Sequence, residues 1–288
     1  MPHGSRDSSQ YWSNFVKNYT RLVANGPSHG AAIHLADAVN DILPFSKASG
    51  ILEVGCGGGQ LITDILEKHA TALPENSRII ASDFVEGMVN IVVDLKQTRI
   101  GQGDAVWNRL EPIVIDAMDL SRFDDGSFSH VLAGLVYGNL PDSAMGLKEA
   151  HRVLEDGGVI GLTSILSAEW MELLSAINEI RPDLPPTPKV KTIAPTWCEA
   201  QQARGHLENA GFRDVSVHEF PVVWKFDTYE KARADLFDAL PFVGTWFEKM
   251  TEEEIEKTKD RAVERIKEMY PTEPNALRGT AVLAIGRK

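Results

Sequence analysis

The stretch ILEVGCGGGQL, residues 51–61, constrains the fold of this chain more than any other segment. Its first residues form a short apolar run, which is typical of a strand buried on both faces of a parallel sheet. Three alternating glycines follow, and glycine permits a sharp turn whose backbone a ligand can approach closely. Residues 61–70 then carry apolar side chains at helical spacing. The segment therefore predicts a strand, a ligand-binding turn and a helix.

Two classes of nucleotide cofactor use such a turn, and the glycine spacing helps to separate them. In the dinucleotide fingerprint G-x-G-x-x-G, the third glycine lets the helix pack close beneath a pyrophosphate. In this chain that position is Gln60, and the glycines are Gly55, Gly57 and Gly59. S-adenosylmethionine has no phosphate to cradle, and an acid such as Glu53 suits its amino-acid end. We favour S-adenosylmethionine over a nicotinamide cofactor, and a turn kept only for structure is the third interpretation.

A second expected strand, residues 78–82, leads into Asp83, which lies 24 positions after Gly59. A carboxylate at this position can accept hydrogen bonds from both hydroxyls of a ribose. Alternatively, Asp83 caps the helix that is expected to begin near Val85. One carboxylate cannot easily fill both roles, so the two interpretations compete.

Further apolar runs continue the alternation of strands with helices. They occupy residues 112–115, 128–135, 159–163, 215–224 and 280–285. This order predicts an α/β fold with a doubly wound, mostly parallel seven-stranded sheet and right-handed crossovers. In such a sheet the ligand binds at the carboxyl ends of the strands.

Residues 51–164 resemble the core of the class I S-adenosylmethionine-dependent methyltransferases, a Rossmann-like fold. The resemblance rests on the glycine loop, on Asp83, and on the motif EAHRVLEDGGVIGLTS near the fifth strand. It implies that Asp116 and an adjacent backbone N–H hold the adenine, with Asp119 as a competing turn residue. The implied cofactor-binding residues are Glu53, Gly55, Cys56, Gly57, Gly59, Asp83, Phe84, Met88, Asp116, Ala117, Met118, Val136, Tyr137, Tyr11 and Tyr19.

The segments that flank this core are expected to close over it. An amphipathic helix is predicted near the N-terminus, and in related enzymes such helices cover the cofactor with an aromatic residue near the sulfonium. An aromatic stripe that merely packs on the sheet is the alternative. Near the C-terminus, Thr251 and Glu254 form a capping box ahead of a second amphipathic helix, and Pro271 follows its end.

We expect five segments along the chain. They are an N-terminal helical cap (1–45), a cofactor-binding Rossmann-like core (46–165), an insertion with a helix and the sixth strand (166–225), a helical lid (226–271) and a final strand (272–288). In layout this resembles small-molecule methyltransferases of fungal secondary metabolism.

Aromatic side chains on the flanking helices predict an enclosed apolar pocket for a small organic acceptor. The residues assigned to this pocket are Trp12, Trp170, Phe242 and Trp246. An aromatic set at helical spacing also suits an ordinary hydrophobic core, which is the alternative.

The need for a catalytic base depends on the acceptor. A thiol with a pKa of about 8.5 is partly ionised at neutral pH, whereas a phenol near pKa 10 profits from a base. The candidate catalytic residues are Tyr137, His34 and His218, and each also has a structural explanation.

Charge and composition exclude several classes of protein. The formal net charge is −12, which disfavours nucleic acid and anionic membranes as partners because a polyanion binder normally shows a basic face. No signal-peptide core is present and no run approaches about 18 apolar residues, so we expect a soluble, cytoplasmic protein. The spacing of the two cysteines and of the scattered histidines predicts no metal site. A magnesium site formed by scattered carboxylates is left as an alternative. The oligomeric state is not predicted.

The sequence therefore predicts an enzyme that transfers a methyl group from S-adenosylmethionine to an oxygen, sulfur or nitrogen atom of a small apolar metabolite, with S-adenosylhomocysteine as product. The alternative within this fold is a cofactor-binding protein that catalyses a non-methylating step, such as a pericyclic reaction, or that acts as a regulator. A nicotinamide oxidoreductase is the third class.

Overall fold

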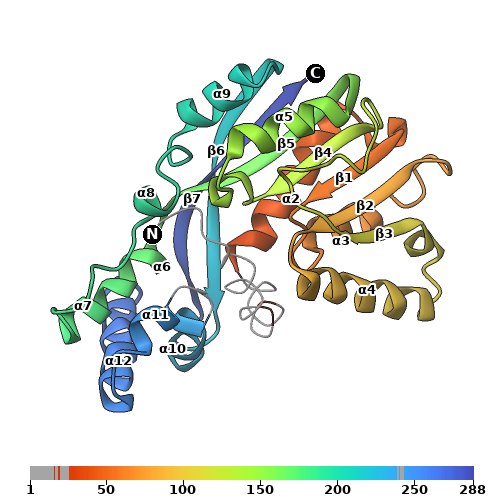
Figure 1. The fold of residues 1–288 in the computed structure, drawn as a ribbon. Helices are drawn as coiled ribbons and strands as arrows, with labels where there is room; N and C mark the ends of the chain where they lie inside the picture. Colours follow the sequence, from red (N-terminus) through yellow and green to blue (C-terminus); the bar gives the residue numbers. More distant parts are fainter. Residues whose placement is uncertain (1–15, 17–18, 20–25, 239, 241–242) are drawn as a thin grey trace.

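A computed structural model of the chain describes residues 16, 19, 26–238, 240 and 243–288 (Figure 1). Its centre is a seven-stranded sheet in the order β3-β2-β1-β4-β5-β7-β6. The strands are β1 (Gly50–Val54), β2 (Arg78–Asp83), β3 (Leu110–Val114), β4 (Phe128–Gly134), β5 (Leu154–Ala168), β6 (Arg213–Phe226) and β7 (Asn275–Arg287). The expected doubly wound, mostly parallel fold is confirmed, because β7 alone reverses direction between β5 and β6.

The order of strands reverses between β1 and β4, and this reversal positions the site. β1 pairs in parallel with β2 on one side and with β4 on the other. Chain connections leave in opposite directions from this point, which opens a crevice at the carboxyl ends of the two strands. The glycine loop begins at the carboxyl end of β1 and therefore lies at the crevice.

Helices cover both faces of the sheet (Figure 1). One face packs against α2 (Pro27–Ile42), α3 (Gln60–His69) and α4 (Glu86–Gly101), and the other against α5 (Ser143–Val153) and α9 (Ala200–Asn209). Successive residues of a strand point to opposite faces, so Ile51 joins the first core and Leu52 the second. Both residues are fully buried, as expected for a central parallel strand.

Further helices form a third structural layer at one end of the long strands (Figure 1). They are α6 (Glu169–Glu172), α7 (Ala176–Ile180), α10 (Tyr229–Asp238), α11 (Gly244–Phe247) and α12 (Glu252–Met269), with the 3-10 turn η4 (Leu173–Ser175). Outside this layer, α8 (Val190–Ile193) contacts β5, and the 3-10 turns η1 (Phe45–Lys47), η2 (Ala105–Arg109) and η3 (Tyr137–Asn139) lie next to β1, β3 and β4. Helix α12 packs against both α7 and α10. The insertion (166–225) and the helical lid (226–271) predicted from the sequence therefore contact each other. We call α6, η4, α7, α10, α11 and α12 the helical layer.

Three strands are longer than the sequence predicted. β5 extends from Leu154 to Ala168, and β6 and β7 also exceed their expected ranges at both ends. The physical reason is antiparallel pairing, since β7 gives β5 hydrogen-bonding partners as far as Ala168 and gives β6 partners as far as Phe226. Among the described helices, none combines the length and apolarity needed to cross a membrane.

Candidate functional site

The glycine loop has the backbone that its sequence requires. Gly55, Gly57 and Gly59 have φ angles of 66°, 51° and 81°, in the left-handed region that favours glycine. The amide of Cys56 donates to the carbonyl of Ser82 at 2.8 Å, which ties the loop to β2. Burial, with the nearby Glu53 and Asp83 carboxyls, raises the pKa of the Cys56 thiol. Cys56 is therefore a neutral packing residue in this loop.

Asp83 connects the two loops that follow β1 and β2. Its Oδ2 accepts a hydrogen bond from the amide of Gly57 at 3.0 Å, and its Oδ1 accepts one from the amide of Val85 at 2.9 Å. The side chain thus orders the glycine loop and the start of α4 together. A carboxylate has about four acceptor sites, so both oxygens keep capacity for hydroxyl donors. The pKa of Asp83 is raised by burial, which outweighs these hydrogen bonds.

Glu53 is a second buried carboxyl group beside Asp83. It lies on β1, and its Oε2 accepts a hydrogen bond from the amide of Ile62 in the first turn of α3, at 3.1 Å. Burial raises the pKa of Glu53 to about 8, and the charge of Asp83 adds to the rise. Such a carboxyl group holds a proton near neutral pH unless a cation lies close to it.

Tyr19 lies against the glycine loop. A Cβ atom added to Gly57 would meet the Tyr19 hydroxyl group, and the backbone of Gly58 hydrogen-bonds to that hydroxyl. Burial and the charge of Asp83 raise the pKa of Tyr19, so its phenol is neutral. Val16 packs in the same way against Gly87, 3.0 Å from the Cβ position. Tyr11, also assigned to the cofactor, lies outside the described residues.

The loop after β4 brings Val136 to the glycine loop but turns Tyr137 into the core. A Cβ atom on Gly55 would contact the Val136 side chain. The ring of Tyr137 is buried and stacks on Trp197 with 5.9 Å between centroids. Its hydroxyl has no hydrogen-bond partner among the described residues, and burial raises its pKa. Leu135, which directly precedes Val136, has a φ of 61°, a strained angle that no sequence motif predicted.

The residues assigned to adenine make local turns. The Oδ1 of Asp116 accepts a hydrogen bond from the amide of Met118 at 2.8 Å, and Asp119 does the same for Ser121 at 3.1 Å. Asp116 is exposed, whereas Ala117 is buried beside it. Of the other residues assigned to the cofactor, Phe84 is exposed, and Met88 lies on α4 and is buried in the core.

The structure brings neither candidate histidine to the glycine loop. His34 is exposed on α2 and its ring lies tilted against Phe220 of β6, with 4.2 Å between ring centroids. His218 is exposed on β6, the edge strand, and three strands separate β6 from β1. Both residues had been selected by their chemistry alone, without a motif that fixed their place.

The tryptophans assigned to the substrate pocket pack inside or beside the helical layer. Trp170 lies against Gly279 and makes an edge contact with Trp224, with ring centroids 6.1 Å apart. The indole of Trp246 donates to the carbonyl of Pro185 at 2.8 Å. Both indole rings are buried, and Trp12 and Phe242 lie outside the described residues.

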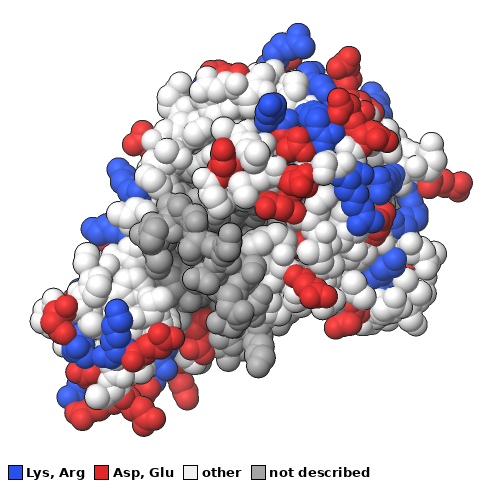
Figure 2. Space-filling view, viewed as in Figure 1, with Lys and Arg blue, Asp and Glu red and all other residues white. Residues whose placement is uncertain are grey.

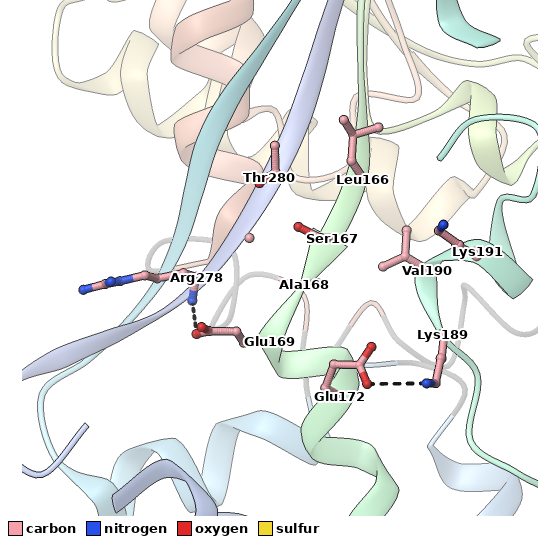
Figure 3. Close-up of a pocket in the computed structure, with 11 residues that line it drawn as sticks. Leu166, Ser167, Ala168, Glu169, Glu172, Lys189, Val190, Lys191, Arg278 and Thr280 are labelled. Atoms are coloured by element: carbon pink, nitrogen blue, oxygen red, sulfur yellow. Dashed lines mark hydrogen bonds and ion pairs between the residues drawn. The ribbon is translucent and has the colours of Figure 1, made fainter. Parts of the chain in front are cut away.

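A cavity of about 520 Å³ lies at the end of β5 (Figure 3), and Trp170 packs against Gly279, one of its lining residues. Its lining is Leu166, Ser167, Ala168, Glu169, Glu172, Lys189, Val190, Lys191, Arg278, Gly279 and Thr280. Sequence analysis missed these residues because they belong to no motif and come from three distant segments. Within the described parts of the chain, no group of three or more His, Cys, Asp or Glu residues could hold a metal ion.

Comparison with known proteins points to one family. A family model described as a methyltransferase domain matches residues 52–162, which include the glycine loop and Asp83. Methyltransferase ucsB of Acremonium sp. is 29% identical to this chain over 284 residues, covering 98% of this chain and 96% of the relative.

Two solved structures share the fold. Phosphoethanolamine N-methyltransferase 2 of Haemonchus contortus, solved with phosphomonomethylethanolamine and S-adenosylhomocysteine, has a TM-score of 0.53 at 13% identity, covering 98% of this chain and 58% of that chain. The 4+2 cyclase SpnF has a TM-score of 0.51 at 17% identity, covering 88% of this chain and 80% of that chain. At these identities the likeness shows the fold alone.

Proposed function

Because this chain is a class I S-adenosylmethionine-dependent methyltransferase, we propose that it methylates an oxygen, sulfur or nitrogen atom of a small apolar metabolite in secondary metabolism. The observation that carries the proposal is the hydrogen bond from the Gly57 amide to Asp83. It holds a glycine turn and a carboxylate together at the crevice between β1 and β4.

The residues around the loop fit the donor. Glu53, buried with a raised pKa, is suited to an ammonium group because a nearby cation favours the charged carboxylate. Asp83 has acceptor capacity for the ribose hydroxyls, and Val136 supplies an apolar wall beside Gly55. We assign the adenine to residues 116–118. S-adenosylmethionine, when bound, supplies an electrophilic methyl group.

The contribution of the protein is mainly positional. In-line displacement gains about 7 to 11 kcal/mol from correct alignment of two reactants. Neither His34 nor His218 lies at the loop, and the neutral, buried Tyr137 is a poor base. We therefore favour an acceptor that ionises without help. A thiol loses about 2 kcal/mol at neutral pH by being mostly protonated, and a phenol about 4 kcal/mol.

Charge argues for a small acceptor. Figure 2 shows Lys and Arg interspersed with Asp and Glu over the visible face, and acidic groups gather near α12. The whole chain carries a net charge of −12. Such a surface repels polyanions, so we propose a small-molecule acceptor.

The test combines calorimetry with transfer of label. S-adenosylhomocysteine should bind the wild-type chain, and Asp83→Ala should weaken that binding by about 1.5 to 3 kcal/mol, the scale of a charge-assisted hydrogen bond. Asp119→Ala is the matched control, because Asp119 is an exposed turn residue. Equal affinity in all three proteins would refute the ribose role of Asp83.

Methyl-labelled S-adenosylmethionine, incubated with the chain and a fractionated metabolite extract, tests the reaction itself. Label that moves to a small molecule supports methyl transfer. Cofactor-dependent conversion without label supports the alternative, a non-methylating step, and the fold is shared with a protein named as a cyclase. Binding without any conversion favours a regulator.

A further inference from the structure

The cavity at the end of β5 lies near the loop after β4, whose Val136 lies against Gly55 of the glycine loop. Just past the point where β5 stops pairing with β4, Ser164 and Ala194 both lie against Gly138 of the loop after β4. The cavity begins two residues further along β5, at Leu166. A strand rises about 3.3 Å per residue, so this separation is roughly 7 Å, within reach of one small molecule.

One wall of the cavity is cationic. Lys189 and Lys191 stand on this wall, at the start of α8 (Figure 3). The ammonium of Lys189 is 3.8 Å from Glu172, and the two side chains are 69% and 64% exposed. An ion pair between side chains this exposed contributes little to stability. Among the described residues, no carboxylate lies within ion-pair distance of Lys191.

The second acid of the cavity does not neutralise this wall. Glu169 accepts hydrogen bonds from the hydroxyl of Tyr270 and from the amide of Arg278, both at 2.7 Å. In Figure 3 its carboxylate turns toward β7 and away from the lysines. The guanidinium of Arg278 lies over the Tyr270 ring, 5.4 Å from its centroid. The lysine wall is therefore locally positive in a chain whose net charge is −12.

The rest of the lining suits the body of an organic molecule. Leu166, Ala168 and Val190 are apolar, and Ser167 and Thr280 offer hydroxyl groups. A volume of about 520 Å³ lies in the range of small-molecule sites. We propose that this cavity binds the methyl acceptor, and that the acceptor joins an apolar body, held by Leu166, Ala168 and Val190, to one carboxylate, held by Lys189 and Lys191. This inference rests on the proposed function, since it assigns a substrate class to the same enzyme.

The test compares an acid with its ester. Calorimetry in the presence of S-adenosylhomocysteine measures the binding of 2,4-dihydroxybenzoate and of its methyl ester to the wild-type chain. The acid should bind about tenfold more tightly, the scale of partly exposed charge-assisted hydrogen bonds. The double variant Lys189→Gln/Lys191→Gln should bind both equally. The double variant Lys47→Gln/Lys148→Gln, an equal charge change at exposed sites on η1 and α5, should keep the preference, as should Lys191→Arg.

Failure of the inference can be told from failure of the proposed function. If the acid does not bind, if the ester binds equally well, or if the double variant keeps the preference, the cavity is not a carboxylate site. Binding of S-adenosylhomocysteine alone is measured first in every protein. Its absence from the wild-type chain refutes the proposed function, whereas normal binding together with a lost acid preference refutes only the carboxylate assignment.

Discussion

At the residue scale, the loop site is defined by two buried carboxyl groups with different partners. Glu53 accepts a hydrogen bond from α3, and Asp83 accepts two from the loops that follow β1 and β2. Burying a charge is costly unless it is paired, and a carboxyl group can avoid the cost by keeping its proton. Glu53 does so, which leaves a group that a cationic ligand can ionise.

Glu53 makes the stability of the chain depend on pH. Its pKa is 4.5 in the reference state and about 8 in the folded chain, so the folded state binds the proton more tightly. The stability due to this proton is complete below pH 4.5 and is lost as the pH rises through 8. At about 1.4 kcal/mol per pH unit, the free energy of unfolding should fall by a few kcal/mol over this interval.

Urea unfolding of wild-type and Glu53→Gln proteins at pH 5, 6.5 and 8 measures this contribution. Glutamine keeps an acceptor for the Ile62 amide but does not titrate. The free energy of unfolding of the variant should therefore rise relative to that of the wild type as the pH increases. Glu75→Gln, at an exposed position, is the control and should follow the wild type. Parallel pH curves for all three proteins would show that Glu53 is ionised in the folded chain.

Gly57 and Gly157 both have left-handed backbones. Substitutions at these two positions therefore separate the effect of side-chain crowding from the effect of backbone strain. Gly57 has a φ of 51° and Gly157 one of 81°, so valine at either position should cost about 1 to 2 kcal/mol of stability through the left-handed backbone. A Cβ at Gly57 meets Tyr19, whereas one at Gly157 meets nothing within 4 Å. Calorimetry should show that Gly57→Val abolishes binding of S-adenosylhomocysteine and that Gly157→Val retains it. Similar affinities in both variants would place the donor away from this loop.

Local patterns predicted the loop, and non-local geometry explains what they missed. A strand, a turn and a helix that are contiguous in sequence specify Gly57 and its neighbours. The bond from Gly57 to Asp83 depends on the register of β1 against β2, which the sequence does not state. The position of His34 depends on the packing of α2 against β6, and the position of His218 depends on the place of β6 at the edge of the sheet. Residue chemistry alone could not exclude them.

At the scale of elements, strand length is set by the partner as much as by the residues. The apolar centre of β5 was predicted, but residues 165–167 near its end are partly buried or exposed and carry no strand pattern. They remain extended because β7 pairs with them. This extension includes Leu166, Ser167 and Ala168, which line the cavity. The proposed acceptor site therefore depends on an antiparallel pairing that the hydrophobic periodicity of the sequence could not reveal.

The capping box of α12 was predicted and is confirmed. Thr251 accepts from the amide of Glu254 at 3.3 Å, and Glu254 accepts from the amide of Thr251 at 2.8 Å. Thr251→Ala should therefore lower the free energy of unfolding by about 1 kcal/mol, measured in urea. Thr71→Ala, in an exposed turn, should have little effect. An equal loss in both variants would mean that the cap adds nothing to the stability of the helical layer.

At the scale of the whole molecule, the donor and acceptor regions occupy neighbouring parts of one sheet. The glycine loop follows β1, Val136 follows β4, and the cavity follows β5, and these three strands are adjacent. The loop joins β1 to β2 through Asp83, so a ligand bound there contacts several parts of the core at once. Ligand binding should therefore stabilise the fold as a unit.

The size of this stabilisation follows from mass action and gives a test on the intact chain. S-adenosylhomocysteine at 100 times its Kd should add about 2.7 kcal/mol to the stability of the folded state. For a chain of this size each kcal/mol raises Tm by about 2 °C or more, so thermal unfolding should shift upward by roughly 5 °C. NAD at the same concentration is the control and should leave Tm unchanged, because Gln60 replaces the glycine that a pyrophosphate site needs. A rise in Tm with NAD and none with S-adenosylhomocysteine would show that the glycine loop binds a dinucleotide and would refute the proposed S-adenosylmethionine site.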